Sequence, residues 1–133
     1  MNVNLLAPYF LTVLAEPWLR KTRGSVVHIT DIYGESAFLP GYPAYAASKS
    51  ALVFLTKYLA SSMAPDVRVN AVSPGVISFP QAHSPAKRRK LLRKTALRRQ
   101  GTPEDIAQAV YFLATQTFVT GQVLRVDGGR FIP

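Results

Sequence analysis

The chain has 133 residues, 48% of them hydrophobic, which is long enough and apolar enough to bury the core of one globular domain. It contains no cysteine, which excludes disulfides and thiolate metal sites, and we predict no metal centre. No apolar run is long enough to span a bilayer, and the first residues lack the pattern of a secretory signal. We therefore expect a cytoplasmic protein without membrane contact.

The net charge of +9 comes almost entirely from one segment, residues 87–99, which holds eight of the 16 basic residues. The rest of the chain carries 8 basic against 7 acidic residues and is close to neutral. The segment is interpreted first as a solvated helix face, then as a site for an anionic ligand or cofactor phosphate, and last as a polyanion surface. Nucleic-acid binding is unlikely on these residues, because no aromatic side chains are interleaved to stack on bases.

Helices and strands alternate along the chain. In order, we predict a helix over residues 2–23, a strand over 25–30, a loop over 31–40, a helix over 42–63, a strand over 67–72, a loop over 78–85, a basic helix over 86–97, a helix over 102–115 and a strand over 122–126. The strands are short β-branched runs, and the helix over 102–115 starts with a capping threonine, a proline and two acids. Pro8 and Pro17 should bend or shorten the first helix.

This alternation predicts a parallel sheet with right-handed crossovers. The strand over residues 25–30 is apolar enough to be covered on both faces, yet no earlier strand in the chain can pair with it. A long apolar strand left at an edge invites association. We therefore interpret the chain as part of a larger α/β sheet.

Tyr45 and Lys49 stand four residues apart in the helix over residues 42–63, so their side chains share one face. A tyrosine with an ordinary pKa of about 10 exchanges protons easily near pH 7 only if that pKa falls by about 3, or about 4 kcal/mol. A lysine cation about 4 Å away, at an effective dielectric of about 20, supplies energy of that order. The pair is able to transfer protons, although a plain amphipathic helix would show the same spacing.

Four ordered motifs carry a resemblance to a known family. They are Val-Asn-Leu-Leu-Ala-Pro over residues 3–8, Tyr-Ala-Ala-Ser-Lys over 45–49, Arg-Val-Asn-Ala-Val-Ser-Pro-Gly over 68–75, and the segment 120–129 that ends in Asp-Gly-Gly. With these motifs the chain resembles the C-terminal half of the short-chain dehydrogenases/reductases. The resemblance implies one partial domain over residues 1–133, the C-terminal half of a doubly wound, Rossmann-type α/β fold with three parallel strands and flanking helices.

The resemblance also implies roles for individual residues. Tyr45 would donate the proton during reduction, Lys49 would lower its pKa and hydrogen-bond the nicotinamide ribose, and Asn4 would hold a water that links Lys49 to solvent. The cofactor would be bound by Tyr45, Lys49, Pro74, Gly75, Val76 and Ile77. The substrate would be contacted by Asp31, Tyr45, Ser73 and Phe79, beneath a lid formed by the basic helix. Asp31 would also have a catalytic role, orienting the substrate or relaying a proton through Tyr45.

Each of these residues has a plainer interpretation from the sequence alone. Asp31 would end a strand and cap a turn, Asn4 would start a helix, and Ser-Pro-Gly would be only a turn. His28 is predicted to be a packed histidine rather than a ligand, and His83 is predicted to be exposed.

Asp31 departs from the majority pattern of the family, which has a serine at the end of this strand. Pteridine reductases and the bacterial dihydromonapterin reductases carry an aspartate there, and a carboxylate accepts hydrogen bonds from the amino groups and ring nitrogens of a pterin. The resemblance therefore implies an NADPH-dependent reductase of a dihydropterin. The alternatives are another short-chain reductase of a carbonyl substrate, such as a 3-oxoacyl thioester, and a non-catalytic fragment that associates with itself.

The glycine-rich turn that holds the cofactor pyrophosphate in this family is missing from the sequence. We therefore do not expect this chain alone to bind NADPH tightly. We interpret the chain as a truncated or mis-started reading frame of such a reductase. The alternatives are a fragment that a partner carrying the other half of the fold completes, and a non-catalytic remnant. In this family the helices over residues 2–23 and 42–63 pack against their copies, which implies a homodimer or homotetramer.

Overall fold

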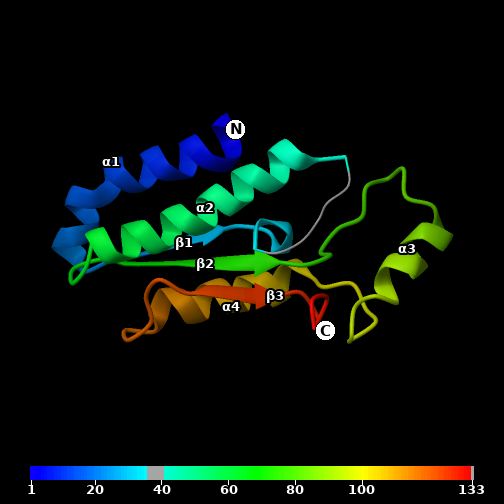
Figure 1. Cartoon of the computed structure of the whole chain (residues 1–133). Helices are drawn as coiled ribbons and strands as arrows, with labels where there is room; N and C mark the ends of the chain where they lie inside the picture. Colours follow the sequence, from blue (N-terminus) through cyan, green and yellow to red (C-terminus); the bar gives the residue numbers. More distant parts are fainter. Residues whose placement is uncertain (36–40, 133) are drawn as a thin grey trace.

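The computed structural model describes residues 1–35 and 41–132 of the chain. Its centre is a sheet of three parallel strands, β1 (Ser25–Ile29), β2 (Arg68–Pro74) and β3 (Val123–Val126), in the order β1-β2-β3. The register pairs Val27 with Asn70 and Val72 with Leu124. All three strands point in the same direction in Figure 1, so their carboxyl ends lie along one edge. The predicted parallel α/β arrangement is confirmed.

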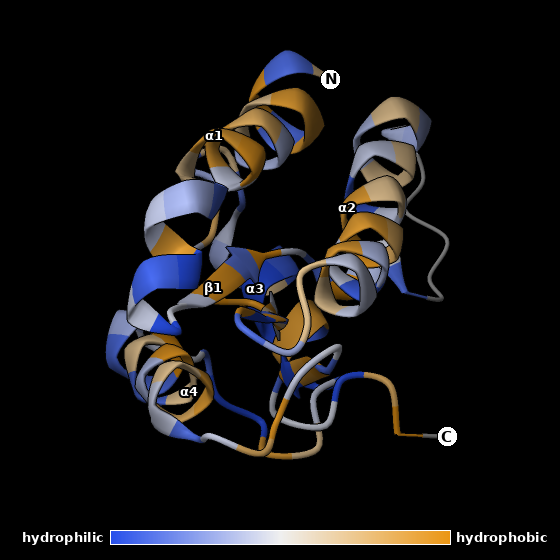
Figure 2. Cartoon of the chain, turned by 90° about the vertical axis from the view of Figure 1, so that its left-hand side faces the viewer, coloured by the Kyte–Doolittle hydropathy of each residue, from blue (hydrophilic) through white to orange (hydrophobic). Residues whose placement is uncertain are grey.

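The helices cover both faces of this sheet. They are η1 (Asn2–Leu6, a π-helix), α1 (Ala7–Thr22), η2 (Ile32–Gly34, a 3₁₀ helix), α2 (Pro43–Ser62), α3 (Pro85–Leu92) and α4 (Pro103–Thr115). Figure 2 shows α1 and α2 on one side of the strands and α4 on the other. No helix of the described residues is long and apolar enough to cross a membrane.

The core lies between α2 and β2. Leu59 and Ala60 of α2, and Met63 directly after it, are buried against Val67 and Val69, and the residues from Val69 to Ser73 are fully enclosed. A second, polar contact ties α1, β1 and α2 together: His28 Nε2 lies 3.1 Å from Thr12 Oγ1, and Nδ1 lies 2.9 Å from Thr56 Oγ1. The prediction of a packed His28 is confirmed.

The ends of the first helix follow from its prolines and glycine. Pro8 stands in the first turn of α1, where its missing N–H leaves no helical hydrogen bond unmade, while Pro17 is accommodated inside the helix. Arg23 adopts the left-handed conformation (φ 49°) and Gly24 N donates to Leu19 O at 2.8 Å, which closes the helix where it was predicted to stop.

The predicted basic helix over residues 86–97 is wrong in its second half, because α3 ends at Leu92. The following residues turn inward: Thr95 is buried, Leu97 N donates to Gly128 O at 3.0 Å, and Arg98 has a φ of 52°. Contacts with the C-terminal segment thus override a composition that suits a longer helix. Of the predicted loop over 31–40, the first part forms η2, and residues 36–40 lie outside the described residues.

β1 forms one edge of the described sheet, as predicted, and Ile29 is 44% exposed. The strand that pairs with it, β2, is central in the sheet and almost entirely buried. An edge strand presents unpaired backbone groups, which makes it a site for further pairing.

Candidate active site

Asp31 stands directly after β1 and caps the 3₁₀ helix η2. Its Oδ1 accepts a hydrogen bond from Tyr33 N at 2.9 Å, and its carbonyl oxygen accepts one from Gly34 N at 2.8 Å. The carboxylate is half-buried. The turn-capping interpretation of Asp31 is therefore confirmed, and it leaves the second carboxylate oxygen available for another partner.

That second oxygen binds Tyr45. The phenol O–H donates to Asp31 Oδ2 at 2.7 Å, across the gap between β1 and the first turn of α2. Lys49, one turn further along α2, donates from Nζ to Ile29 O at 2.9 Å, and its Nζ lies 5.9 Å from the centre of the Tyr45 ring. Three of the predicted catalytic side chains, Asp31, Tyr45 and Lys49, are thus brought together at the carboxyl end of β1.

The electrostatics of this group differ from the sequence prediction. Burial raises the pKa of Tyr45 far above its ordinary value, and the Asp31 carboxylate raises it further. Burial lowers the pKa of Lys49, against a smaller upward effect from Asp31. The net pKa shift of Tyr45 is therefore upward in this structure, because burial and the facing Asp31 carboxylate prevail while the Lys49 ammonium lies over the ring; the lowering by Lys49 stays a prediction.

Asn4 is placed with Lys49 but not with Tyr45. A cavity of about 270 Å³ opens between η1, α1 and α2; its lining residues include Asn4, Pro8, Ile29 and Lys49. Asn4 is half-buried, and it lines this cavity together with Lys49 and with Ile29, whose carbonyl accepts a hydrogen bond from the Lys49 ammonium. A cavity of this size holds several waters, so the link through water from Asn4 to Lys49 remains a prediction.

The turn after β2, residues 74–77, packs against the last strand and the start of α4. Gly75 N donates to Val126 O at 3.0 Å, and a Cβ at Gly75 would lie 2.6 Å from Asp127 Cα, so no side chain fits there. Val76 O accepts from Gly101 N at 3.0 Å, and Ile77 O accepts from Gln100 Nε2 at 2.6 Å. Two of the four predicted cofactor-binding residues of this turn thus have their carbonyls occupied.

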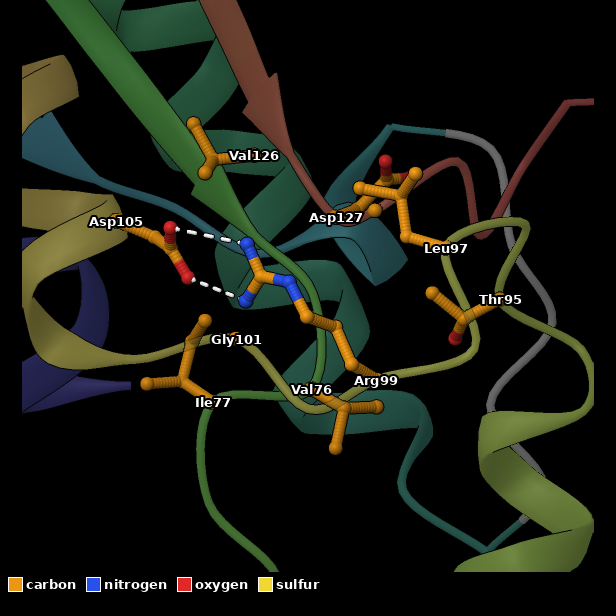
Figure 3. A pocket seen from close by; sticks show the side chains of 10 residues that line it. Val76, Ile77, Thr95, Leu97, Arg99, Gly101, Asp105, Val126 and Asp127 are labelled. Carbon is orange, nitrogen blue, oxygen red and sulfur yellow. Dashed lines mark hydrogen bonds and ion pairs between the residues drawn. The ribbon is translucent and has the colours of Figure 1, made fainter.

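Val76 and Ile77 line a second, smaller cavity of about 100 Å³. Figure 3 shows the Arg99 guanidinium reaching across it to Asp105, with N–O distances of 2.9 and 3.2 Å. Tyr45 does not line this cavity, although Tyr45, Val76 and Ile77 were all predicted to bind the cofactor.

Ser73 and Phe79 are less accessible to a substrate than predicted. Ser73 is completely buried, so its hydroxyl is not exposed at the surface of the chain where a substrate would bind. Phe79 is half-buried in a small cluster: its ring centroid lies 6.2 Å from that of His83, and the Arg88 guanidinium lies over it at 5.7 Å. The prediction that His83 is exposed is wrong, since the ring lies tilted against Phe79 and the residue is half-buried.

Two residues beside the site were not predicted, Glu35 and Arg125. Arg125 Nε on β3 donates to Glu35 Oε2 at 3.2 Å, next to the turn that carries Asp31. The pair joins residues 90 positions apart, so no local spacing indicates it. Within the described residues no group of three or more His, Cys, Asp or Glu side chains could hold a metal ion.

Comparisons with known proteins place this geometry in a family. A family model described as enoyl-(acyl carrier protein) reductase matches residues 1–130. A 3-oxoacyl-[acyl-carrier-protein] reductase of Thermotoga maritima is 40% identical over 138 residues, covering 99% of this chain and 56% of that protein. A dihydromonapterin reductase of Klebsiella pneumoniae is 35% identical over 133 residues, covering 98% of this chain and 55% of that protein.

The fold is also shared with a solved structure of a 3-oxoacyl-[acyl-carrier protein] reductase from Brucella melitensis with bound NAD. The TM-score is 0.88 and the sequences are 31% identical; the match covers 99% of this chain and 50% of that one. The chain thus spans about half the length of the curated relatives and the solved structure that it matches.

Proposed function

Since the chain belongs to the short-chain dehydrogenase/reductase family, we propose that it carries the proton-transfer part of a reductase site that uses NADPH to reduce a dihydropterin in the cytoplasm. The observation that carries the proposal is the 2.7 Å hydrogen bond from the Tyr45 phenol to Asp31, with Lys49 alongside. Because the chain spans about half the length of its relatives, the activity is tested in the longest polypeptide that the gene encodes.

The residues present fit one end of a nicotinamide cofactor. Tyr45 and Lys49 are adjacent, half-buried donors, a chemistry that suits the hydroxyls of a ribose. Val76 and Ile77 would meet the cofactor through their backbone amides, since their carbonyls are occupied. The cofactor would supply the hydride.

The raised pKa of Tyr45 favours reduction over oxidation. At pH 7 the phenol is fully protonated, so Tyr45 holds the proton that a reduced ring nitrogen requires. To give that proton away, the hydroxyl turns from Asp31 to the substrate. Lys49 then lies close enough to stabilise the phenolate that remains.

Asp31 explains the preference for a pterin in this proposal. Its carboxylate is fixed by the backbone of its own turn and is an acceptor only, whereas a serine hydroxyl both donates and accepts. A pterin offers an amino group and ring N–H donors that would replace the Tyr45 phenol as partners of Asp31. A ketone offers no such donor.

The test is NADPH oxidation by the full-length protein with a dihydropterin, comparing wild type with Tyr45→Phe. Loss of a general acid costs about 10²–10⁴-fold in rate, so we expect turnover to fall by that order with the substrate KM little changed. Retention of most of the activity in Tyr45→Phe would refute the proton-donor role.

A 3-oxoacyl thioester is the second candidate substrate. The relative of 40% identity is named as a reductase of 3-oxoacyl groups on the acyl carrier protein. In addition, the basic segment 87–99 beside the Phe79 loop offers cations to an anionic carrier. Asp31→Ser separates the two candidates: it should weaken dihydropterin reduction and leave or improve reduction of the thioester. If Asp31→Ser instead weakens reduction of the thioester and leaves dihydropterin reduction unchanged, the thioester would be favoured as the native substrate.

We further propose that α1 and α2 form the contact of a homodimer, or of one dimer within a homotetramer. Both helices present large apolar side chains at a spacing of four residues: Phe10, Leu14 and Trp18 on α1, and Phe54 and Tyr58 on α2. Light scattering of wild type and of Phe54→Glu tests this. A monomeric wild-type chain would contradict it.

A further inference from the structure

We propose that Arg125 and Phe131, from the last strand and the C-terminal segment, are positioning residues that hold the 31–35 turn so that Asp31 meets the Tyr45 phenol. The role in catalysis rests on the function proposed above. The positioning itself does not, and it is measurable without turnover.

The ion pair between Arg125 and Glu35 anchors one end of the turn. Of the four ion pairs in the described part of the chain, this one has the most enclosed carboxylate, with the Glu35 side chain 14% exposed and Arg125 41% exposed. An exposed pair contributes little, but a carboxylate this enclosed depends on its partner for compensation. Glu35 is therefore not free to leave Arg125 while the turn keeps its place.

An aromatic contact anchors the middle of the turn. The rings of Tyr33 and Phe131 meet edge to face, with centroids 6.0 Å apart and planes at 86°. This geometry is the favourable one for two aromatic rings. Tyr33 also donates its backbone N–H to Asp31 Oδ1, so the residue that Phe131 contacts is the same one that orients the Asp31 carboxylate.

Backbone hydrogen bonds tie the anchored residues to Asp31. Gly34 N donates to Asp31 O at 2.8 Å and Glu35 N to Ile32 O at 3.2 Å, so the segment from Asp31 to Glu35 is closed by its own backbone. On its other side it lies directly on α2, where a Cβ at Gly34 would come within 2.7 Å of the Lys49 carbonyl carbon. The turn is held between α2, which carries Tyr45, and the C-terminal segment.

This arrangement assigns the C-terminal segment a role that its sequence does not suggest. α2 fixes where Tyr45 lies, while Arg125 and Phe131 fix where Asp31 lies. The charged side chains facing the Tyr45 phenol within the described residues are Asp31 and Lys49, and the Glu35–Arg125 pair is electrically balanced. Arg125→Ala and Glu35→Gln unbalance this pair in opposite senses, so a fall of the Tyr45 midpoint in both variants would come from the position of Asp31 and not from the new charge.

The experiment is a titration of the 133-residue chain carrying 3,5-difluorotyrosine at position 45, followed by ¹⁹F NMR. Fluorination brings the phenol into a measurable pH range. Asp31→Asn serves as the reference, because it removes the carboxylate that raises the Tyr45 pKa. We expect Arg125→Ala and Phe131→Leu each to lower the Tyr45 midpoint by a measurable part of the Asp31→Asn change, and the double variant to approach it.

Arg20→Ala is the matched control, since it removes an arginine with two ion pairs, to Glu16 and Asp66, at the far end of α1. Its titration should equal that of wild type, and Glu35→Gln should behave like Arg125→Ala. Unchanged midpoints in folded Arg125→Ala and Phe131→Leu would overturn the inference. An unchanged midpoint in Asp31→Asn would instead remove the contact on which the proposed function depends.

Discussion

His28 and Asp31 lie three residues apart on one strand and its continuation, yet their surroundings are opposite. His28 is 5% exposed and has a threonine at each ring nitrogen, from α1 and from α2. Asp31 is half-buried, with one oxygen on its own turn and the other on a phenol that can turn away. A polar group whose partners are all fixed and internal supports the fold, whereas one with an exchangeable partner at a surface can serve chemistry.

The largest expected contrast is in stability. His28→Ala removes a buried ring and leaves Thr12 and Thr56 without their imidazole partner. We therefore expect the free energy of unfolding to fall by about 3 kcal/mol. Tyr45→Phe, which removes only a half-buried hydroxyl, should cost about 1 kcal/mol or less. Urea denaturation of both variants measures this. Similar losses would show that the two clusters are equally structural.

The second contrast is the response to acid. Burial lowers the pKa of His28 to about 4, from an unfolded value of about 6.5. Below pH 6.5 the unfolded chain therefore binds a proton at His28, whereas the folded chain binds it only near pH 4. The contribution of His28 to the free energy of unfolding is complete above pH 6.5 and falls by about 3 kcal/mol as the pH is lowered to 4. Denaturation midpoints between pH 7 and 4 should show this fall. In His28→Gln, which cannot titrate, this part of the pH dependence should be absent.

The third prediction separates the two threonines that contact His28. Thr56 is completely buried and Thr12 is 4% exposed, and each hydroxyl lies within hydrogen-bond distance of both His28 and a carbonyl of its own helix. Because a neutral imidazole carries one N–H, one hydroxyl accepts from the ring and the other donates to it. Thr→Val keeps the shape and removes the hydrogen bonds, so we expect about 1–2 kcal/mol at Thr56 and the lower end of that range at Thr12. Thermal unfolding of both variants gives the order. A larger loss at Thr12 would place the main support in α1.

The smallest expected effect lies at alkaline pH. Because the pKa of Tyr45 is raised in the folded chain, folded Tyr45 keeps its proton above pH 10 while unfolded tyrosine loses it. This contribution to stability is complete below pH 10 and is lost as the pH rises further. It is small, since Tyr45 is half-exposed and solvent screens the effect. Comparison of wild type with Tyr45→Phe above pH 10 tests it.

The parts of the fold that were predictable depend on local patterns. The β-branched run over residues 25–30 and the capped start at Thr102 produce their elements almost where predicted, because burial and capping act over a few residues. The end of α3 was not predictable, since it depends on Leu97 meeting Gly128. Helical composition alone contains no information about that contact.

The candidate site divides in the same way. The spacing of Tyr45 and Lys49 predicted that they share a helix face, and they do. The pKa of Tyr45 is raised rather than lowered, because the phenol is buried and its oxygen takes Asp31 as its partner; both depend on how a turn packs on α2. Glu35 and Arg125 lie outside any motif and are joined only by the fold.

The close approach of Gly75 to Asp127 bears on the order in which the chain folds. The turn after β2 completes its hydrogen bonding only when Val126 O reaches Gly75 N, and these two residues lie far apart in the sequence. Because closing a long loop costs chain entropy before its contacts form, we expect this contact to form late in folding. The carboxyl edge of the sheet then takes its working shape only when β3 has docked on β2.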